Sequence, residues 1–545
     1  MVRLNFPDDI ANAPSTSTIT TKNTVLTFQP RNLAISRSNM GELSVDMRIL
    51  AVDELTIDQV HTAYKRGTYT ARHLTEAYIA RIKALDQTGP KLNAITAVST
   101  TALDEAVALD HYFESNSKFI GPLHGIPVIV KDQCDTKGLE TTYGNLRCKH
   151  IPTEDATLVK RLRDAGAIVL AKSTMPDFAA SYNSCSSVSG ETLNPYDTTR
   201  ETGGSSAGTG AAIAANYGLI GVGEDTGGSI RVPASFCNLV GLRPTVGMVS
   251  RAGLSPLVKT QDTPGPMTRT VRDAAIMLDA LVGFDEKDLY TTAVSIAGPP
   301  KGGSYASNLT EKTLAGARIG VLKSVFGDDR DPECGAVNKT LRAAFAKFTT
   351  GTTLVEIDDI PNLKHYLGFT STYKSRSHFD IDNFLKAHPH LDLTLDQLYE
   401  SKSFHQSLSL WQDIASSKSN THPYEDPDYA GRLDQREDFQ RIVIGIMAKH
   451  NLDALAYPSV RIPPPTVEDV VGPRFNDEFP TNTVIGSQLR MPAISVPVGF
   501  TEEGKPHGGL PVGLELLGMP FREQLLLELA YGVEQLTKAR RAPVF

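Results

Sequence analysis

The 545-residue chain has few of the features that mark disulfide-rich, membrane-spanning or nucleic-acid-binding proteins. It has only five cysteines, widely spaced and without a C-x-x-C pair, which argues against a disulfide framework or a zinc site. Its formal net charge of −8 offers no attraction to nucleic acid or an anionic membrane. The N-terminus carries Asp8 and Asp9 and no apolar signal-peptide core. We therefore expect a cytoplasmic protein with neither nucleic-acid nor membrane partners.

Long apolar runs are also scarce. Residues 203–223 carry no charge and are numerous enough to span a bilayer, but they consist mainly of Gly, Ser, Ala, Thr and Asn. Hydrophobic residues make up 40% of the chain and charged residues 21%, which is typical of a soluble globular protein. These proportions exclude a disordered or fibrous chain.

Local patterns divide the chain into an arm and one domain. Residues 1–49 are rich in Ser, Thr and Asn and weakly patterned, so we expect an N-terminal arm there and a single domain over 50–545. Thr56 and Gln59 predict a capping box for a first helix, and Thr70 is placed to cap a second. Residues 285–436 are polar and mostly helical where patterned, which predicts a peripheral insertion that could cover a pocket.

Short apolar segments alternate with helical patterns along the domain, as in α/β proteins. The helix face of Leu158, Leu162 and Ala165, followed by Gly166 and an apolar run, predicts a helix, a tight turn and a parallel strand. The predicted strands are 126–130, 168–171, 318–322, 452–457, 494–498 and 512–517.

Glycine is concentrated in one region, because residues 201–250 hold 11 of the 43 glycines. Two Gly-Gly-Ser units end at Ser205 and Ser229, 24 residues apart, with a predicted small-residue helix over 207–217 between them. Glycine is needed where the backbone adopts positive φ or approaches another group closely. The second unit, Thr226-Gly227-Gly228-Ser229, offers consecutive N–H groups without bulky side chains. This pattern predicts an anion-binding turn that could act as an oxyanion hole, with Ser229 as a candidate nucleophile.

A serine nucleophile needs a base, and no histidine lies between residues 203 and 234. Lys131 ends the apolar run 126–130, and a lysine at the end of a buried strand is poorly solvated, which favours its neutral form. To act as a base near pH 8, its pKa must fall by about two from an ordinary value near 10.4. Taken alone, Lys131 also fits a surface lysine and Ser229 a helix cap.

A second interpretation centres on Ser206. Residues 204–208 match the G-x-S-x-G elbow of α/β-hydrolases, which requires a strand directly before it. Residues 194–202 do not resemble a buried strand, which disfavours an esterase that uses Ser206. Asp225 and Arg231 are expected to form an ion pair that supports the turn around Ser229.

Together, Lys131, Gly-Gly-Ser205-Ser206 and Gly-x-Asp225-x-Gly-Gly-Ser229-x-Arg231-x-Pro-Ala resemble the amidase signature family. Further matching segments are 121–127, 262–275, 491–499 and 510–514, so the resemblance extends from about residue 50 to 540. Within the family, the chain most resembles the peptide-amidase-like and general amidase branch. Position 207 is alanine where the family usually has glycine.

The resemblance implies an α/β fold in which a large, twisted, mixed β-sheet is sandwiched between helical layers. It also implies a Ser–Ser–Lys triad, with Ser229 acylated, Ser205 in a cis peptide bond relaying the proton and Lys131 as base. The N–H groups of Thr226, Gly227, Gly228 and Ser229 would form the oxyanion hole, supported by Ser206, Asp225 and Arg231. No metal or cofactor is implied.

The predicted function is hydrolysis of a small-molecule or peptide amide to the acid and ammonia or an amine. Two alternatives stay open: the catalytic subunit of a glutamine-dependent tRNA amidotransferase, and the esterase that uses Ser206. A binding protein on the same fold is a third. The sequence does not define the acyl group, the amine or the oligomeric state, and it allows a homodimer.

Overall fold

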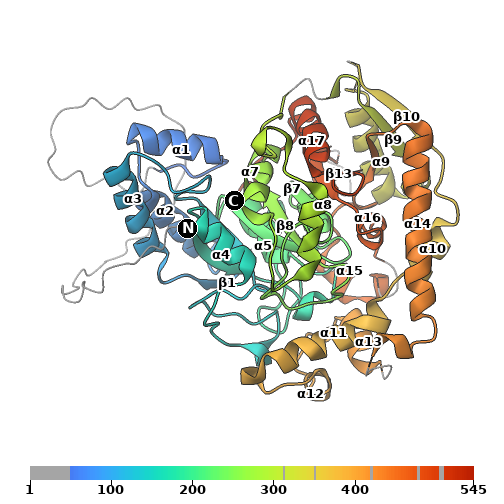
Figure 1. Cartoon of the computed structure of the whole chain (residues 1–545), viewed down its shortest axis with the longest axis horizontal. Coiled ribbons are helices and arrows are strands. Elements are labelled where there is room, and N and C mark those ends of the chain that lie inside the picture. The colour runs from blue at the N-terminus through green and yellow to red at the C-terminus, as the bar shows by residue number, and fades with distance from the viewer. Residues whose placement is uncertain (1–49, 311–313, 349–350, 418–421, 476–478, 502–508) are drawn as a thin grey trace. The chain divides into compact units, whose positions relative to one another are not determined.

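An eleven-stranded mixed sheet forms the centre of the fold (Figure 1). The computed structural model describes residues 50–545 except 311–313, 349–350, 418–421, 476–478 and 502–508. The predicted arm at 1–49 lies outside the described residues. In spatial order, the strands are β1 (Ile95–Val98), β3 (Ile168–Ser173), β2 (Pro127–Lys131), β6 (Ile220–Asp225), β8 (Thr263–Thr268), β7 (Val240–Arg243), β12 (Ala493–Phe500), β13 (Pro511–Leu517), β11 (Ala454–Pro458), β9 (Arg318–Leu322) and β10 (Thr353–Ile357).

Parallel pairing occurs in two groups of strands. β2 lies between β3 and β6 and is parallel to both, and β9 is likewise parallel to β10 and β11. Antiparallel strands connect the two groups, which makes the sheet mixed. β2, β3 and β6 are buried along their whole length, as expected for strands covered on both faces. The α/β fold class is therefore confirmed, and each of the six predicted strands corresponds to a strand of this sheet.

Helices cover the sheet and surround its ends. The Thr56–Gln59 capping box is present, and Thr70 caps the second helix together with His73. The α-helices are α1 (Ile57–Arg66), α2 (Ala71–Leu85), α3 (Ala102–Asn116), α4 (Thr157–Asp164), α5 (Ala207–Ala214), α6 (Arg231–Phe236), α7 (Val271–Leu281), α8 (Ala293–Ala297), α9 (Pro332–Phe345), α10 (Leu363–Phe369), α11 (Tyr373–Ala387), α12 (Leu395–Glu400), α13 (Ser409–Ser416), α14 (Tyr429–His450), α15 (Val467–Val471), α16 (Val484–Gln488) and α17 (Glu523–Thr537).

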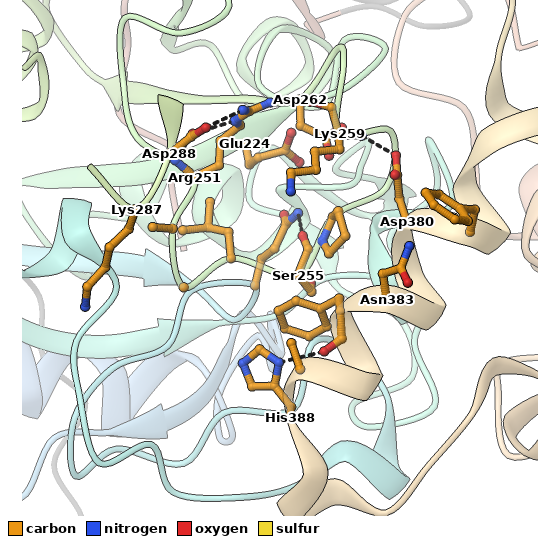
Figure 2. A pocket seen from close by; sticks show the side chains of 18 of the residues that line it. Glu224, Arg251, Ser255, Lys259, Asp262, Lys287, Asp288, Asp380, Asn383 and His388 are labelled. Atoms are coloured by element: carbon orange, nitrogen blue, oxygen red, sulfur yellow. Dashed lines mark hydrogen bonds and ion pairs between the residues drawn. The ribbon is translucent and has the colours of Figure 1, made fainter. Parts of the chain in front are cut away.

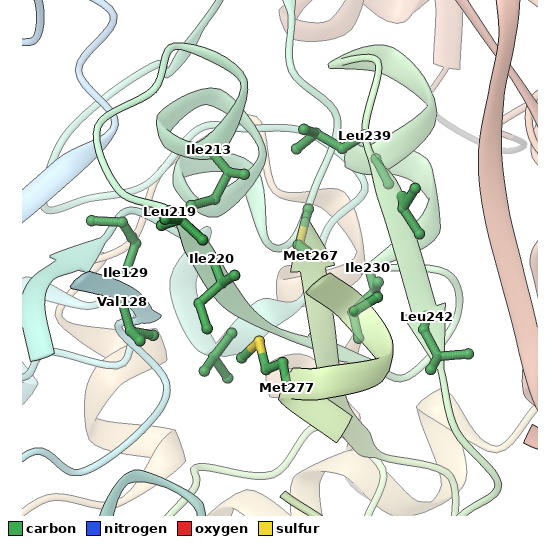
Figure 3. Close-up of a cluster of buried hydrophobic side chains, with 14 of the residues drawn as sticks. Val128, Ile129, Ile213, Leu219, Ile220, Ile230, Leu239, Leu242, Met267 and Met277 are labelled. Carbon is green, nitrogen blue, oxygen red and sulfur yellow. The ribbon is translucent and has the colours of Figure 1, made fainter. Parts of the chain in front are cut away.

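The core around β6 is closely packed because small residues let a helix approach the sheet. A Cβ at Gly221 of β6 would lie 2.6 Å from Thr209 and 2.8 Å from Ile213, both on α5. Figure 3 shows Ile213 of α5 and Met277 of α7 packing around Ile220, together with Met267 of β8. The uncharged segment 203–223 thus forms a turn, a short buried helix and a strand. Among the described residues, no helix is long and apolar enough to cross a membrane.

The segment 285–436 combines sheet strands with a group of helices. It supplies β9 and β10 to the central sheet, and it includes α11, α12 and α13, which lie together in Figure 1. These three helices share an apolar cluster that includes Ile381, Leu398 and Trp411. The boundaries of the arm, the domain and the insertion stay predictions.

Candidate active site

Lys131 lies where the sequence places it, as the last residue of β2, and its side chain is fully buried. Its Nζ donates hydrogen bonds to Ser205 Oγ (2.8 Å) and to the backbone carbonyl of Glu224 (3.2 Å). Burial lowers the pKa of Lys131, and the charge of Glu224 opposes that effect. The lysine therefore has the environment of a base rather than of a solvated surface cation.

Ser205 and Ser206 form the turn that enters α5, and the Gly204–Ser205 peptide bond is cis. The Ser206 N–H donates to the carbonyl of Ser229 (3.1 Å), so this turn packs directly against the second Gly-Gly-Ser unit. Ser206 Oγ donates to the Glu224 carbonyl and accepts from the Glu224 N–H, both at 3.2 Å. These contacts give the Ser206 hydroxyl a structural role.

The strand before Ser206 does not have the position that a hydrolase elbow requires. It is β5 (Asp197–Glu201), which pairs with β4 (Leu193–Asn194) in a two-stranded sheet apart from the central sheet and forms a single β-bridge from Arg200 to Thr466. Two of its five residues are exposed. Because the elbow projects from a strand of the central sheet, this arrangement does not support it.

Ser229 ends a tight turn between β6 and α6 and is buried, with 4% of its surface exposed. The carbonyl of Gly227 accepts from Tyr182 (3.1 Å) and Thr483 (2.8 Å), and the carbonyl of Thr226 accepts from Gln261 (2.7 Å). Within the described part of the chain, the N–H groups of residues 227–229 donate to no acceptor. A turn with its carbonyls engaged and its N–H groups free has the character of an anion nest.

The two glycines of this turn are required by its surroundings. A Cβ at Gly227 would lie 2.2 Å from the Tyr373 hydroxyl and 2.5 Å from that of Tyr182. Gly228 has a φ of +135°, and a Cβ there would lie 1.8 Å from Thr483 Oγ1. Side chains from distant parts of the chain therefore hold the turn in place.

Asp225 and Arg231 form the predicted ion pair, at 3.1 Å, and both are fully buried. The carboxylate of Asp225 also binds Arg243 (2.8 Å) and accepts from the Ile230 N–H (3.1 Å). Burial alone would raise the pKa of Asp225, but the charges of Arg231 and Arg243 outweigh it and hold this pKa well below its usual value. The pair thus links β6, the start of α6 and β7 around the Ser229 turn.

Several residues of this site are not predicted from the sequence. Glu515 of β13 binds Arg231, and Thr483 and Tyr182 hold the turn from distant segments. Glu224 lies inside the motif, between Gly223 and Asp225, and a charged residue in a buried strand is a signal that could identify it. The contact between its carboxyl and Lys131 emerges only from the fold.

A second buried lysine, Lys172 of β3, has a different environment. Its Nζ donates to the carbonyl of Cys134 (2.6 Å) and to Thr141 Oγ1 (2.7 Å), and it lies 3.3 Å from Asp132. Three acceptors surround this nitrogen, and none of them is a serine of the two Gly-Gly-Ser units. Its surroundings contrast with those of Lys131, whose closest partner is the Ser205 hydroxyl.

A cavity of about 440 Å³ lies beside the site (Figure 2). Glu224 and Gln133 line it from the sheet side, and Asp380 and His388 line it from α11 and the residue after it. Figure 2 shows Glu224, Lys259 and Ser255 around the same space. Residues of the predicted insertion therefore form part of the cavity wall. The cavity also extends to Glu224, which is a neighbour of Lys131.

Comparison with known proteins shows which family the chain resembles. A family model described as Amidase matches residues 73–527. The glutamyl-tRNA(Gln) amidotransferase A-subunit from Alkaliphilus metalliredigens is 33% identical over 510 residues, covering 89% of this chain and 97% of that protein. The crystal structure of native peptide amidase from Stenotrophomonas maltophilia has a TM-score of 0.78 at 31% identity, covering 90% and 99% of the two chains. The amidotransferase A-subunit from Thermotoga maritima has a TM-score of 0.69 at 25% identity, covering 91% and 98%.

Proposed function

The chain belongs to the amidase family and is a hydrolase of amide C–N bonds, and from this premise we propose that it cleaves a carboxylic amide through an acyl-enzyme on Ser229. The single observation that carries the proposal is the 2.8 Å contact between the buried Lys131 Nζ and Ser205 Oγ. This contact lies beside the Ser229 turn, whose N–H groups are available to bind an oxyanion. The products are the carboxylic acid and ammonia or an amine.

In the proposed reaction, neutral Lys131 accepts the proton of Ser205 while Ser205 accepts the proton of Ser229. Ser229 Oγ then attacks the amide carbonyl carbon, and the oxyanion is bound by backbone N–H groups between Thr226 and Ser229. The relayed proton passes to the leaving nitrogen as the C–N bond breaks. Water then attacks the acyl ester by the same proton route and frees Ser229. No metal or cofactor takes part in the proposal.

The proposal is tested by incubating the protein with a small panel of primary and secondary amides. Released ammonia or amine is measured, and intact-mass spectrometry detects the acyl-enzyme. We expect at least one amide to be hydrolysed with a mass increase equal to its acyl group. Hydrolysis without any covalent intermediate would contradict the mechanism.

A second candidate function is that of an amidotransferase component, because amidotransferase A-subunits are among the relatives that are 33% identical. The higher TM-score with peptide amidase, 0.78 against 0.69, favours a free-standing amidase. We propose that the chain binds no tRNA, in keeping with its net charge of −8. Glutaminase activity that emerges only with added amidotransferase partners, together with tRNA binding, would favour the second candidate.

Replacing each of the two adjacent serines by alanine distinguishes the proposed triad mechanism from the esterase alternative that uses Ser206. Ser205→Ala is expected to lower kcat/KM by about 10²- to 10⁴-fold, because the proton relay is lost. Ser206→Ala removes two hydrogen bonds to the Glu224 backbone, so it should cost roughly 1–3 kcal/mol of stability yet still form the acyl-enzyme. Amide hydrolysis and thermal unfolding measured on both variants decide between the two. The opposite ranking of activities would assign the reaction to Ser206.

Gly228→Ala is expected to lower kcat/KM by about 100-fold or more, because the added Cβ meets Thr483 and displaces the N–H groups that bind the oxyanion. The positive φ adds strain of about 1–3 kcal/mol. Gly138→Ala is a matched control, since Gly138 also has positive φ (+73°) but open space around its Cβ. The control should lose stability without the same loss of activity. Equal activities in the two variants would argue against the assigned oxyanion hole.

A further inference from the structure

Glu224 contacts Lys131 through two separate parts of the residue. Its backbone carbonyl accepts a hydrogen bond from Lys131 Nζ at 3.2 Å. Its carboxyl oxygen Oε2 lies 3.7 Å from the same nitrogen, and both side chains are buried. The backbone contact does not depend on the side chain, so a substitution at position 224 can remove the carboxyl charge while leaving the other contact in place.

The carboxyl of Glu224 is not neutralised by any other cation at ion-pair distance in the described part of the chain. Its neighbour Asp225 binds two arginines, whereas Glu224 pairs only with Lys131. Among the described residues, Glu224 Oε2 is buried without a hydrogen-bond partner, and Oε1 accepts a long bond from Thr226 (3.4 Å). Among the described residues, Lys131 is the one cation at ion-pair distance from this carboxyl, and Asp262 and Asp225 are the acidic groups that act on it.

We propose that Glu224 is a positioning residue for Lys131, whose carboxylate orients the lysine nitrogen and sets the pH at which the lysine becomes a free base. The proposal rests on the function proposed above, since it concerns the same proton transfer. Glu224 acts through Lys131 and is not assigned any contact with the substrate. Glu224 also lines the cavity, so this residue connects the cavity wall to Lys131.

The charges around the pair give the direction of the effect. Burial lowers the pKa of Lys131, while Glu224 opposes it most strongly, followed by Cys134, Asp225 and Asp262. Burial raises the pKa of Glu224 most, Asp262 and Asp225 add to this effect, and Lys131 and Gln133 oppose it, so that the pKa is raised to about 8. Once Glu224 ionises, it holds a proton on Lys131, so the free base needs a higher pH than it would without the carboxylate.

A substitution at position 224 leaves the other charged groups of the cavity unchanged. Arg251 pairs with Asp288 (2.6 Å), and Arg376 pairs with Asp380 (2.8 Å). The other ionisable groups that line the cavity are Lys259, Lys287, Asp262 and His388. Because these groups stay in place, a change in the pH profile on replacing Glu224 reports the loss of its own charge.

Glu224→Gln tests the proposal, because glutamine has nearly the same shape and keeps the backbone contacts. We expect the acidic limb of the kcat/KM profile to move to lower pH by about one to three pH units. The rate of Ser229 labelling by a fluorophosphonate, measured from pH 5 to 10, should shift in the same direction and needs no knowledge of the substrate. Glu224→Asp keeps a carboxylate but places it farther from Lys131, so the acidic limb should shift by less. If the glutamine variant does not fold, the aspartate variant is used in its place.

Ser255→Ala is the matched control, since Ser255 lines the same cavity and its hydroxyl forms no hydrogen bond within the described structure. Its profile should superimpose on that of the wild type. If Glu224→Gln lowers kcat/KM equally at every pH and leaves the acidic limb at the same pH, the proposal is overturned. Glu224 would then have a purely structural role. If the wild-type protein is not labelled on Ser229 at any pH, the proposed function itself fails, which is a distinct result.

Discussion

Ser229→Ala is expected to abolish acyl-enzyme formation and to lower kcat/KM by about 10⁴- to 10⁶-fold. Only the hydroxyl proposed to form the covalent bond is removed, and the N–H groups of the turn stay in place. The residual rate would come from direct attack of water on the amide, which substrate binding and the proposed oxyanion hole still assist. Steady-state rates on a reactive amide and intact-mass spectra after rapid quenching measure the two effects.

This variant should fold like the wild type, which makes its loss of activity interpretable. The Ser229 contact that holds the neighbouring turn is made by its backbone carbonyl, which accepts from the Ser206 N–H and is unaffected by alanine. Thermal unfolding should therefore change by little. A Ser229→Ala protein that still accumulates an acyl adduct would remove Ser229 from the mechanism.

Lys131→Met is expected to lower kcat/KM by about 10²- to 10⁴-fold, the usual contribution of a general base. Methionine fills the buried space without a proton acceptor, so Ser205 loses the nitrogen 2.8 Å away. In the wild type, the neutral fraction of Lys131 increases with pH, so the rate should increase with pH and then level off. The residual rate of the variant should lack that dependence, and a pH series from 5 to 10 measures it.

The control for Lys131→Met addresses the carboxyl that the substitution leaves behind. Without the lysine, Glu224 is a buried acidic group without its cation, which destabilises the fold. The double variant Lys131→Met/Glu224→Gln removes both charges and should regain stability without regaining activity. A double variant with wild-type rates, or a Lys131→Met profile that keeps the wild-type limb, would exclude lysine as the base.

Much of this fold and site can be predicted because the determining signals are local. The apolar run before Lys131 predicts a buried strand end, and the Thr56–Gln59 pair predicts a helix start. The Gly-Gly pairs before Ser205 and Ser229 mark turns that need close backbone approach. Asp225 and Arg231 are six positions apart, near enough along the chain for their pairing to be anticipated. The catalytic roles assigned to these residues stay proposals.

The features that sequence patterns do not predict depend on contacts between distant segments. Thr483 reaches the carbonyl of Gly227 across 256 positions, and Glu515 reaches Arg231 across 284. Glu224 stands beside Asp225, yet the two carboxyls have different partners because alternate residues of a strand point to opposite faces. Spacing alone does not say which of them meets the lysine. The polar composition of 285–436 predicts a helical insertion and its apolar run predicts the strand at 318–322, whereas β10 joins the sheet through its pairing with β9.

The most direct test of the central claim is to locate the serine that a fluorophosphonate modifies. Trypsin leaves Ser205, Ser206 and Ser229 on one peptide, residues 201–231, so fragment ions or a second cleavage after Glu224 must separate Ser229 from the other two. The account predicts one adduct, on Ser229, that forms much more slowly in Lys131→Met. An adduct on Ser206, or labelling of Ser229 at the wild-type rate without Lys131, would contradict it.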